Sequence, residues 1–391
     1  MKLALSLVAS LFWAIASAAP FPAQVAARSK LPRLILYYQT THDPSGRPIS
    51  ILPLINKQHI ALTHLIVGAF HVHANHTIHL NDHPPRSPVF HTLWNETRLL
   101  QAAGVKVLGM VGGAAQGSFT KATLDSGSSN NNNTTTATTT TTSNAFEKSY
   151  ALLRSTITSH RLDGIDLDVE EPMTQAGITR LVRRLHADFG ADFIITLAPV
   201  ATALLRPGGG GNLSGFNYTT LERQVGGKMI AFYNVQFYNG FGHMGNTALF
   251  DRIVASGGGW DARRIVVGQL TSPVNGGGFV GHKSLARSIA VLRRRYGEIG
   301  GVVGWEYFNG VPGGVGKPWR WAAVMTRILR PGREPRLRIT RETAERLKEA
   351  WMVAARAAGD GNGTVTTERW AGLVPNVDYA GMVNEYSVGR E

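Results

Sequence analysis

Short apolar runs recur along the chain, each bounded by glycine, proline or polar residues and followed by enough residues for a helix. This pattern predicts buried parallel strands joined by crossover helices. One intervening segment places Phe146, Tyr150, Leu153 and Ile157 at helical spacing, as in a helix packed on a sheet. The runs that we interpret as strands are 34–38, 63–70, 105–111, 163–170, 193–199, 230–238, 264–270 and 300–308.

Eight strand–helix units predict an α/β fold, namely a (β/α)8 TIM barrel over residues 31–330. A doubly wound open sheet is the competing fold, but no GxGxxG sequence follows the first run. In a barrel of this kind the active site is built at the carboxyl ends of the strands. Candidate functional residues are therefore those at the ends of the runs.

The fourth run carries acids among its apolar residues, in RLDGIDLDVEEP at 161–172. Alternate side chains of a strand share a face, so Asp166, Asp168 and Glu170 should all project into the barrel, with Glu170 at the carboxyl end. Burial and like charge both oppose ionisation of all three, so at least one should hold a proton, as a general acid must. A buried ion-pair network is the alternative, but the strand contributes no Lys or Arg.

Two further acids of this stretch, Asp163 and Glu171, lie at odd offsets from the other three. Their side chains should point to the opposite face of the strand. We expect Asp163 to anchor the entrance of the strand and Glu171 to be solvated or ion-paired. Neither is expected to take part in the chemistry.

The segment DGIDLDVE resembles the DGxDxDxE signature of family 18 glycoside hydrolases, the chitinases and related enzymes, with Asp163 and Gly164 as its first two fixed positions. The resemblance extends over about residues 31–330. The runs at 63–70 and 300–308 are similar to the family's second and eighth strands, and QFYN at 236–239 is similar to the sixth-strand motif of class III, hevamine-like chitinases of plants and fungi.

The resemblance implies catalytic roles for four residues. Glu170 would protonate the leaving glycosidic oxygen while the N-acetyl carbonyl of the substrate attacks the anomeric carbon, which retains the configuration. Asp168 would hold the acetamido N–H and share a proton with Asp166, and Tyr238 would fix the acetamido carbonyl oxygen. The family's SxGG reads Met110, Val111, Gly112, Gly113 here, and loss of that serine is expected to weaken the polar support of Asp166.

Three further residues are expected to bind substrate. Trp305, at the upper end of the run 300–308, matches the tryptophan beneath the sugar site, although an ordinary core aromatic is the alternative. Tyr38 is assigned a similar platform role on the first run, and Gln236 belongs to the QFYN motif. The segment between 270 and 300 leaves no room for an insertion domain, so we expect an open groove and internal cleavage.

The expected function is that of a secreted chitinase that hydrolyses β-1,4-linked N-acetylglucosamine polymers without a metal or an organic cofactor. Endo-β-N-acetylglucosaminidases that act on N-glycans carry the same signature, so the acidic strand does not separate them. Non-catalytic lectins of this fold also exist, often after losing the acidic glutamate, but Glu170 is present here.

The N-terminal sequence predicts the cellular compartment, and the distribution of charge argues against nucleic acid as a partner. Lys2, the apolar run 3–16 and the Ala-Ser-Ala site at 16–18 predict a signal peptide over 1–18, hence a secreted protein in the medium or the cell wall. The formal charge is +14, but Lys and Arg are scattered and no nucleic-acid motif accompanies them. No later run is long enough to span a membrane, and we expect a monomer. Asn-x-Ser/Thr triplets predict a glycoprotein and lie at Asn75, Asn95, Asn132, Asn133, Asn212, Asn217 and Asn362.

Two segments depart from the barrel pattern. Residues 126–144 form a polar, Asn- and Thr-rich insert that cannot bury enough apolar area to fold, and we expect a disordered loop there. Residues 336–391 predict a small helical unit, in which 358–369 resembles the 12-residue calcium loop of an EF-hand. Ala358 and Arg369 occupy the first and last ligand positions of that loop, which argues against calcium binding.

Overall fold

The computed structural model describes residues 31–57, 59–125, 136–205, 211–226 and 229–332. The predicted signal peptide 1–18 and the predicted helical unit 336–391, with its EF-hand-like loop, lie outside these residues. Among the helices of the described ranges, none has the length and apolar character needed to cross a membrane.

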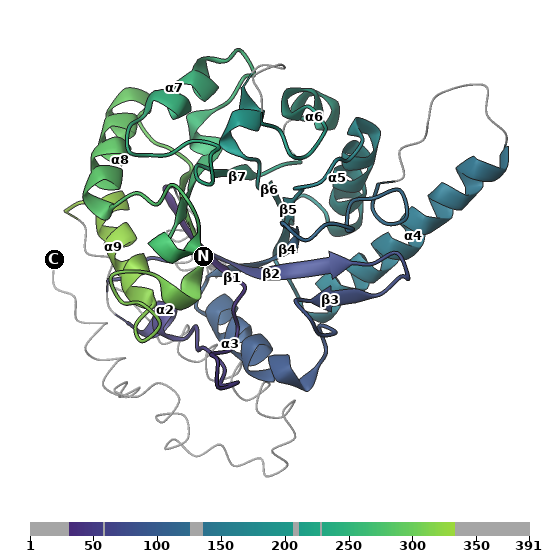
Figure 1. Cartoon of the computed structure of the whole chain (residues 1–391), viewed down its shortest axis with the longest axis horizontal. Helices are drawn as coiled ribbons and strands as arrows, with labels where there is room; N and C mark the ends of the chain where they lie inside the picture. Colours follow the sequence, from purple (N-terminus) through teal and green to yellow (C-terminus); the bar gives the residue numbers. More distant parts are fainter. Residues whose placement is uncertain (1–30, 58, 126–135, 206–210, 227–228, 333–391) are drawn as a thin grey trace, which may run out of the picture.

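Eight parallel strands close into a barrel, which confirms the predicted (β/α)8 fold (Figure 1). The strands follow the order β1-β9-β8-β7-β6-β5-β4-β2, and pairing of β1 with β2 closes the ring. A short ninth strand, β3 (Ile78–Leu80), pairs antiparallel with the end of β2. The barrel strands are β1 (Arg33–Tyr38), β2 (His64–Val72), β4 (Lys106–Gly112), β5 (Gly164–Asp168), β6 (Ile194–Leu197), β7 (Phe232–Gln236), β8 (Ile265–Leu270) and β9 (Gly301–Trp305).

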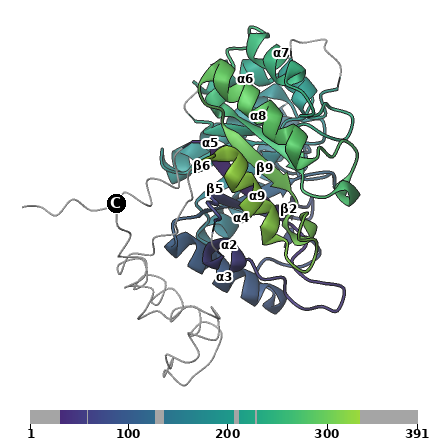
Figure 2. The same ribbon diagram turned by 90° about the vertical axis from the view of Figure 1, so that its left-hand side faces the viewer.

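Helices surround the barrel and cover the outer faces of its strands (Figures 1 and 2). The α-helices are α2 (Pro53–Asn56), α3 (His91–Ala102), α4 (Thr136–Ser159), α5 (Gln175–Phe189), α6 (Tyr218–Val225), α7 (Ala248–Ala255), α8 (His282–Tyr296) and α9 (Trp319–Leu329). Single 3-10 turns are η1 (Pro88–Phe90), η2 (Ala201–Leu204), η3 (Ala262–Arg264), η4 (Pro273–Asn275) and η5 (Tyr307–Asn309).

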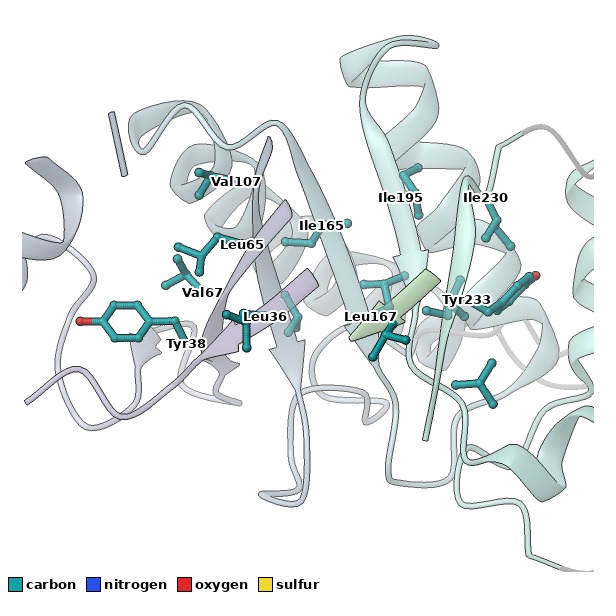
Figure 3. Close-up of a cluster of buried hydrophobic side chains, with 14 of the residues drawn as sticks. Leu36, Tyr38, Leu65, Val67, Val107, Ile165, Leu167, Ile195, Ile230 and Tyr233 are labelled. Atoms are coloured by element: carbon teal, nitrogen blue, oxygen red, sulfur yellow. The ribbon is translucent and has the colours of Figure 1, made fainter. Parts of the chain in front are cut away.

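The apolar side chains of the strands divide into an outer and an inner core. Along β1, Leu34, Leu36 and Tyr38 pack outward against the helices, whereas Ile35 and Tyr37 point into the barrel. Figure 3 shows part of the outer core, including Leu36 and Tyr38. Because both faces of each strand are buried, the strands read as continuous apolar runs, as parallel strands usually do.

The helix α4 corrects our expectation for the polar insert. It begins at Thr136, inside the segment 126–144 that we expected to lack regular structure. Its apolar face is confirmed: Phe146, Tyr150, Leu153 and Ile157 are all buried. Once those turns are formed, adding a residue costs far less than nucleating a helix, so α4 continues into the polar tract and extends beyond the barrel in Figure 1.

Gly164 opens β5 for a geometric reason. A β-carbon at this position would lie 2.1 Å from the carbonyl oxygen of Ile194, its register partner on β6. Only glycine allows the two strands to approach this closely. The residue therefore sets the position of β5, and with it the height of the acidic side chains that follow.

Candidate active site

The acidic face of β5 is arranged as the alternation predicts. Asp166 and Asp168 are 0% and 5% exposed, and both point into the barrel. Glu170 follows two residues after Asp168, at the carboxyl end of the strand, and is partly exposed. The three side chains thus run from the buried interior of the barrel to its upper edge.

Asp166, the innermost acid, accepts hydrogen bonds from three other strands of the barrel, of which only β6 is adjacent to β5. The hydroxyl of Tyr37 donates to Oδ2 at 2.7 Å, that of Thr196 to Oδ1 at 2.6 Å, and the Nδ2 of Asn234 to Oδ1 at 3.0 Å. Burial raises the pKa of Asp166, and these three donors oppose the rise. The polar support that we expected the Met110 position to weaken is therefore supplied from β1, β6 and β7.

Gln236 joins the other two acids. Its Nε2 lies 3.1 Å from Oδ1 of Asp168, 3.0 Å from Oε1 of Glu170 and 3.0 Å from the carbonyl oxygen of Ala198. Burial holds the pKa of Asp168 well above its ordinary value, and the charges of Glu170 and Asp166 raise it further. The raised pKa favours the protonated form of Asp168. Its hydrogen bond runs to Glu170, whereas the family resemblance implied a proton shared with Asp166.

Tyr238 stands just beyond the carboxyl end of β7 and is 7% exposed. Burial raises the pKa of its hydroxyl, and the nearby charges of Asp168 and Glu170 raise it further, so the group is a neutral donor beside the acids. The next residue, Asn239, holds the loop after β8 in place: its Oδ1 accepts from Gly277 N at 2.9 Å, and its own N–H donates to Gly277 O at 2.8 Å.

Trp305 ends β9 and is partly exposed at the upper edge of the barrel. Its ring packs edge-on against Tyr37 at a centroid distance of 5.2 Å. Since the hydroxyl of Tyr37 donates to Asp166, this tyrosine connects the ring of Trp305 with the innermost acid. Trp305 and Glu170 both lie at the carboxyl ends of their strands, so the exposed part of the Trp305 ring is on the same side of the barrel as Glu170.

Tyr38, which we expected to bind substrate, lies on the wrong face for that role. It is 2% exposed, its ring packs edge-on against Tyr307 at 5.9 Å, and its hydroxyl donates to the carbonyl oxygen of Ile49. In Figure 3 it lies among the outer core residues. Because side chains alternate along β1, the inward tyrosine is Tyr37.

Of the two acids on the opposite face, Asp163 lies as we expected and Glu171 does not. Asp163 anchors the strand entrance as expected, accepting from Val107 N at 2.9 Å and from Gln101 Nε2 at 2.8 Å. We expected Glu171 to be solvated or ion-paired, but it is buried, at 6% exposed. Its carboxylate accepts from the backbone N–H groups of Gly117, at 2.9 Å, and Phe119, at 2.8 Å, which ties the loop after β4 to the end of β5.

Sequence reasoning missed three residues of the site, namely Tyr37, Thr196 and Asn234. Asn234 lies two positions before Gln236, so the alternation that selected the acids also places it inside the barrel. Thr196 is the one polar residue of the apolar β6. A polar side chain at an inward position of a buried strand was the available signal in both cases.

A cavity of about 930 Å³ adjoins the site on the side of β1 and β2. Its lining includes Gln39, two residues beyond Tyr37, and Glu306, the residue after Trp305. Histidines of the β2–β3 hairpin, His71, His73 and His79, form part of its wall. Over the described residues, no cluster of three or more His, Cys, Asp or Glu side chains is arranged to hold a metal ion.

Comparison with known proteins gives one family match. The family model described as Glycosyl hydrolases family 18 matches residues 33–305. Among curated protein sequences none matches this chain.

Several solved structures resemble the chain. A fungal endo-β-N-acetylglucosaminidase from glycosyl hydrolase family 18 is 54% identical with a TM-score of 0.71, and the match covers 78% of this chain and 100% of that one. Chitinase ChiC from Aspergillus fumigatus is 45% identical with a TM-score of 0.64, covering 75% and 98%. A family 18 chitinase from Pseudoalteromonas aurantia, at 19% identity and a TM-score of 0.55, covers 76% and 100% and shares the fold.

Proposed function

The chain belongs to family 18 of the glycosyl hydrolases, and we propose that it hydrolyses the β-1,4 bond between two N-acetylglucosamine residues with retention of configuration. The observation that carries this proposal is the row of Asp166, Asp168 and Glu170 along β5 and its carboxyl end, in which Asp168 is hydrogen-bonded to Glu170 and has a pKa well above its ordinary value. Chitin contains this bond throughout, and N-glycans contain it at their core.

In the first half of the reaction Glu170 donates its proton to the glycosidic oxygen, and the bond from that oxygen to the anomeric carbon breaks. The acetamido carbonyl oxygen of the same sugar forms the new bond to the anomeric carbon. The proton that Glu170 donates is the one it shares with Asp168, so its transfer leaves both carboxylates ionised. As the carbonyl carbon becomes positive, the Asp168 carboxylate accepts a hydrogen bond from the acetamido N–H. The neutral hydroxyl of Tyr238 donates to the carbonyl oxygen and holds it in place.

In the second half water attacks the anomeric carbon from the side that the leaving group has vacated. The Glu170 carboxylate takes the proton of this water and returns to its starting form. The carbonyl oxygen leaves the anomeric carbon, and the acetamido group is restored. Two displacements at one carbon give the product the configuration of the substrate.

Two substrates fit this chemistry. Chitin is favoured by the resemblance to class III chitinases and by 45% identity with a fungal chitinase over nearly all of that enzyme's length. N-glycans are favoured by the higher identity, 54%, with a fungal endo-β-N-acetylglucosaminidase whose whole length is covered. The second observation makes an N-glycopeptide the first substrate to try, with a chitin oligomer beside it.

The test compares the wild-type enzyme and Glu170→Gln on a chitin hexamer and on an N-glycopeptide, with products followed by mass and the new anomeric centre by NMR. Cleavage that the substitution abolishes, with retention, supports the proposal, and the substrate cleaved identifies the activity. Sugar binding by the wild type without turnover would overturn the proposal and indicate a lectin. Inverted products would overturn the mechanism alone.

We further propose that the enzyme is exported. The charged and apolar pattern of residues 1–18, ending at Ala18, supports this. Edman sequencing of protein recovered from culture medium should find Ala19 as the first residue. Intact protein that begins at Met1 inside the cell would contradict export.

A further inference from the structure

The two strands that flank Asp166 give it unequal neighbours. Met110 on β4 and Thr196 on β6 are its register partners, so all three side chains point into the barrel side by side. Met110 is 1% exposed and packs with the apolar inner core, and its thioether has no hydrogen to donate. Thr196 is fully buried, and its hydroxyl makes the shortest of the three hydrogen bonds to Asp166, at 2.6 Å.

The donors around Asp166 favour its charged form. Thr196 and Asn234 both donate to Oδ1, and Tyr37 donates to Oδ2, so each carboxylate oxygen is engaged as an acceptor. Hydrogen bonds from several donors to a carboxylate stabilise the ionised state against burial. Among the effects that lower the pKa of Asp166 and so oppose its burial, the bond from Thr196 is the largest.

We propose that Thr196 is a positioning residue that holds Asp166 as the charged member of the acidic face, so that the exchangeable proton stays on the Asp168–Glu170 pair. The inference rests on the proposed function, because it concerns the proton that Glu170 donates. It places the decisive donor on β6, on the opposite side of Asp166 from the apolar Met110. A proton on Asp166 would be out of reach of the substrate, since that side chain is fully buried.

Within the part of the chain that the structure describes, the titratable groups that interact with Asp166 come from four places in the fold. They are Asp168 on β5, Tyr37 on β1, Tyr238 after β7 and Tyr218 on α6. None of them is a cation. The charge of Asp166 is therefore offset by hydrogen-bond donors, and loss of one donor should change its proton affinity directly.

The kinetic test uses Thr196→Val, which keeps the shape of the side chain and removes the hydroxyl, with Thr196→Ser as the matched control that keeps it. In Thr196→Val, Asp166 takes up a proton at higher pH. We expect kcat to fall about tenfold and the acidic limb of its pH profile to move up by about one pH unit, as for loss of a hydrogen bond to a charged group. Thr196→Ser should keep the wild-type limb. An unmoved limb in Thr196→Val, or an equal shift in both variants, would overturn the proposal.

A rescue test separates a lost donor from a disturbed core. In the Thr196→Val background, Met110→Ser places a hydroxyl beside Asp166 on the β4 side, while Met110→Ala leaves a similar gap without a donor. We expect Met110→Ser to move the acidic limb back toward that of the wild type and Met110→Ala to leave it displaced. Equal behaviour of the two double variants would mean that Thr196 acts through packing and would contradict the proposal.

A measurement that needs no turnover keeps this inference separate from the proposed function. Protein carrying ¹³C-carboxyl aspartate is titrated by NMR, and the Asp166 signal is assigned by its loss in Asp166→Asn. The signal should remain that of a carboxylate to lower pH in the wild type than in Thr196→Val. If the wild type cleaves neither test substrate, the proposed function fails, yet this titration still decides the role of Thr196. Identical titrations would overturn it whatever the kinetics show.

Discussion

Tyr37 and Trp305 meet edge to face at 5.2 Å, which brings the partly exposed ring at the rim of the barrel into contact with the residue that donates to Asp166 at 2.7 Å. The ring of Trp305 and the hydrogen bonds of Asp166 thus belong to one packed unit. A change at Tyr37 can act on either end, depending on whether it removes the ring or the hydroxyl.

Tyr37→Phe removes the hydroxyl and leaves the ring contact with Trp305 in place. Loss of a charge-assisted bond to buried Asp166 should lower kcat about tenfold, within the range of such hydrogen bonds, while KM changes little. Steady-state kinetics on the cleaved substrate checks this.

Tyr38→Phe is the matched control, one position along the same strand. Its hydroxyl serves a backbone carbonyl in the outer core, so the variant should lose about 1–2 kcal/mol of unfolding free energy and keep kcat. An equal loss of kcat in both variants would show that Tyr37 acts through strand stability instead of through Asp166.

Trp305→Ala should raise KM by at least tenfold and reduce kcat less, because the change removes a stacking surface and leaves the acids in place. Binding of an uncleaved product oligosaccharide, followed by calorimetry, measures the same loss without catalysis. Trp305→Phe should recover part of the affinity. A fall in kcat with unchanged KM and unchanged binding would remove Trp305 from the sugar site.

Glu171→Gln should destabilise the loop after β4. The carboxylate accepts backbone hydrogen bonds from Gly117 and Phe119 while 6% exposed, and the amide of glutamine turns one acceptor oxygen into a donor. The unfolding free energy should fall by about 1–3 kcal/mol, the cost of leaving a buried donor unpaired. Urea titration measures the loss. Pro172→Ala, a change at the exposed next residue, serves as the control, and its loss of unfolding free energy should be much smaller.

Glu96 should make stability depend on pH. It lies on α3, accepts from Ser50 Oγ and Ile51 N, and burial raises its pKa to about 7. A carboxyl whose folded-state pKa is raised contributes stability below its unfolded pKa of 4.5 and loses that contribution as pH rises to about 7. The wild type should therefore be less stable at pH 8 than at pH 5 by up to about 3 kcal/mol from this group.

Glu96→Gln isolates that contribution, since the amide does not titrate. Urea unfolding at the two pH values should show a smaller difference in the variant than in the wild type. In the wild type, other titratable groups also contribute to the difference in unfolding free energy between the two pH values. The comparison between the two proteins is therefore the informative quantity. An unchanged difference would mean that Glu96 titrates as an ordinary surface carboxyl.

The strands could be predicted because parallel strands buried on both faces have uninterrupted apolar sequences. Each expected run contains its observed strand or overlaps it to within two residues; β5, for example, occupies 164–168 of the expected 163–170. The start of α4 could not be predicted in the same way. Extension of an anchored helix into a polar tract leaves no apolar signal in the residues that it adds.

The acids of β5 could be placed because polar side chains alternate there with apolar ones, which sets the phase of the strand. The run LILYY lacks such a marker, since every position is apolar or aromatic, and the inward and outward tyrosines could not be told apart. Glu171 illustrates a second limit. In the sequence, a carboxylate that accepts hydrogen bonds from backbone N–H groups in a buried loop cannot be distinguished from an acid at the surface.

The partners of the inner acids stand on strands and not on rim loops: Tyr37 on β1, Thr196 on β6, and Asn234 and Gln236 on β7. Their spacing follows from the ladder that closes the barrel. The loop segments beyond Glu170 and Tyr238 can therefore change in length and composition without moving these partners on the strands. Divergence between enzymes that cut different sugar chains can be confined to those loops, and grafting the rim of one relative onto this barrel should transfer substrate range while leaving the chemistry untouched.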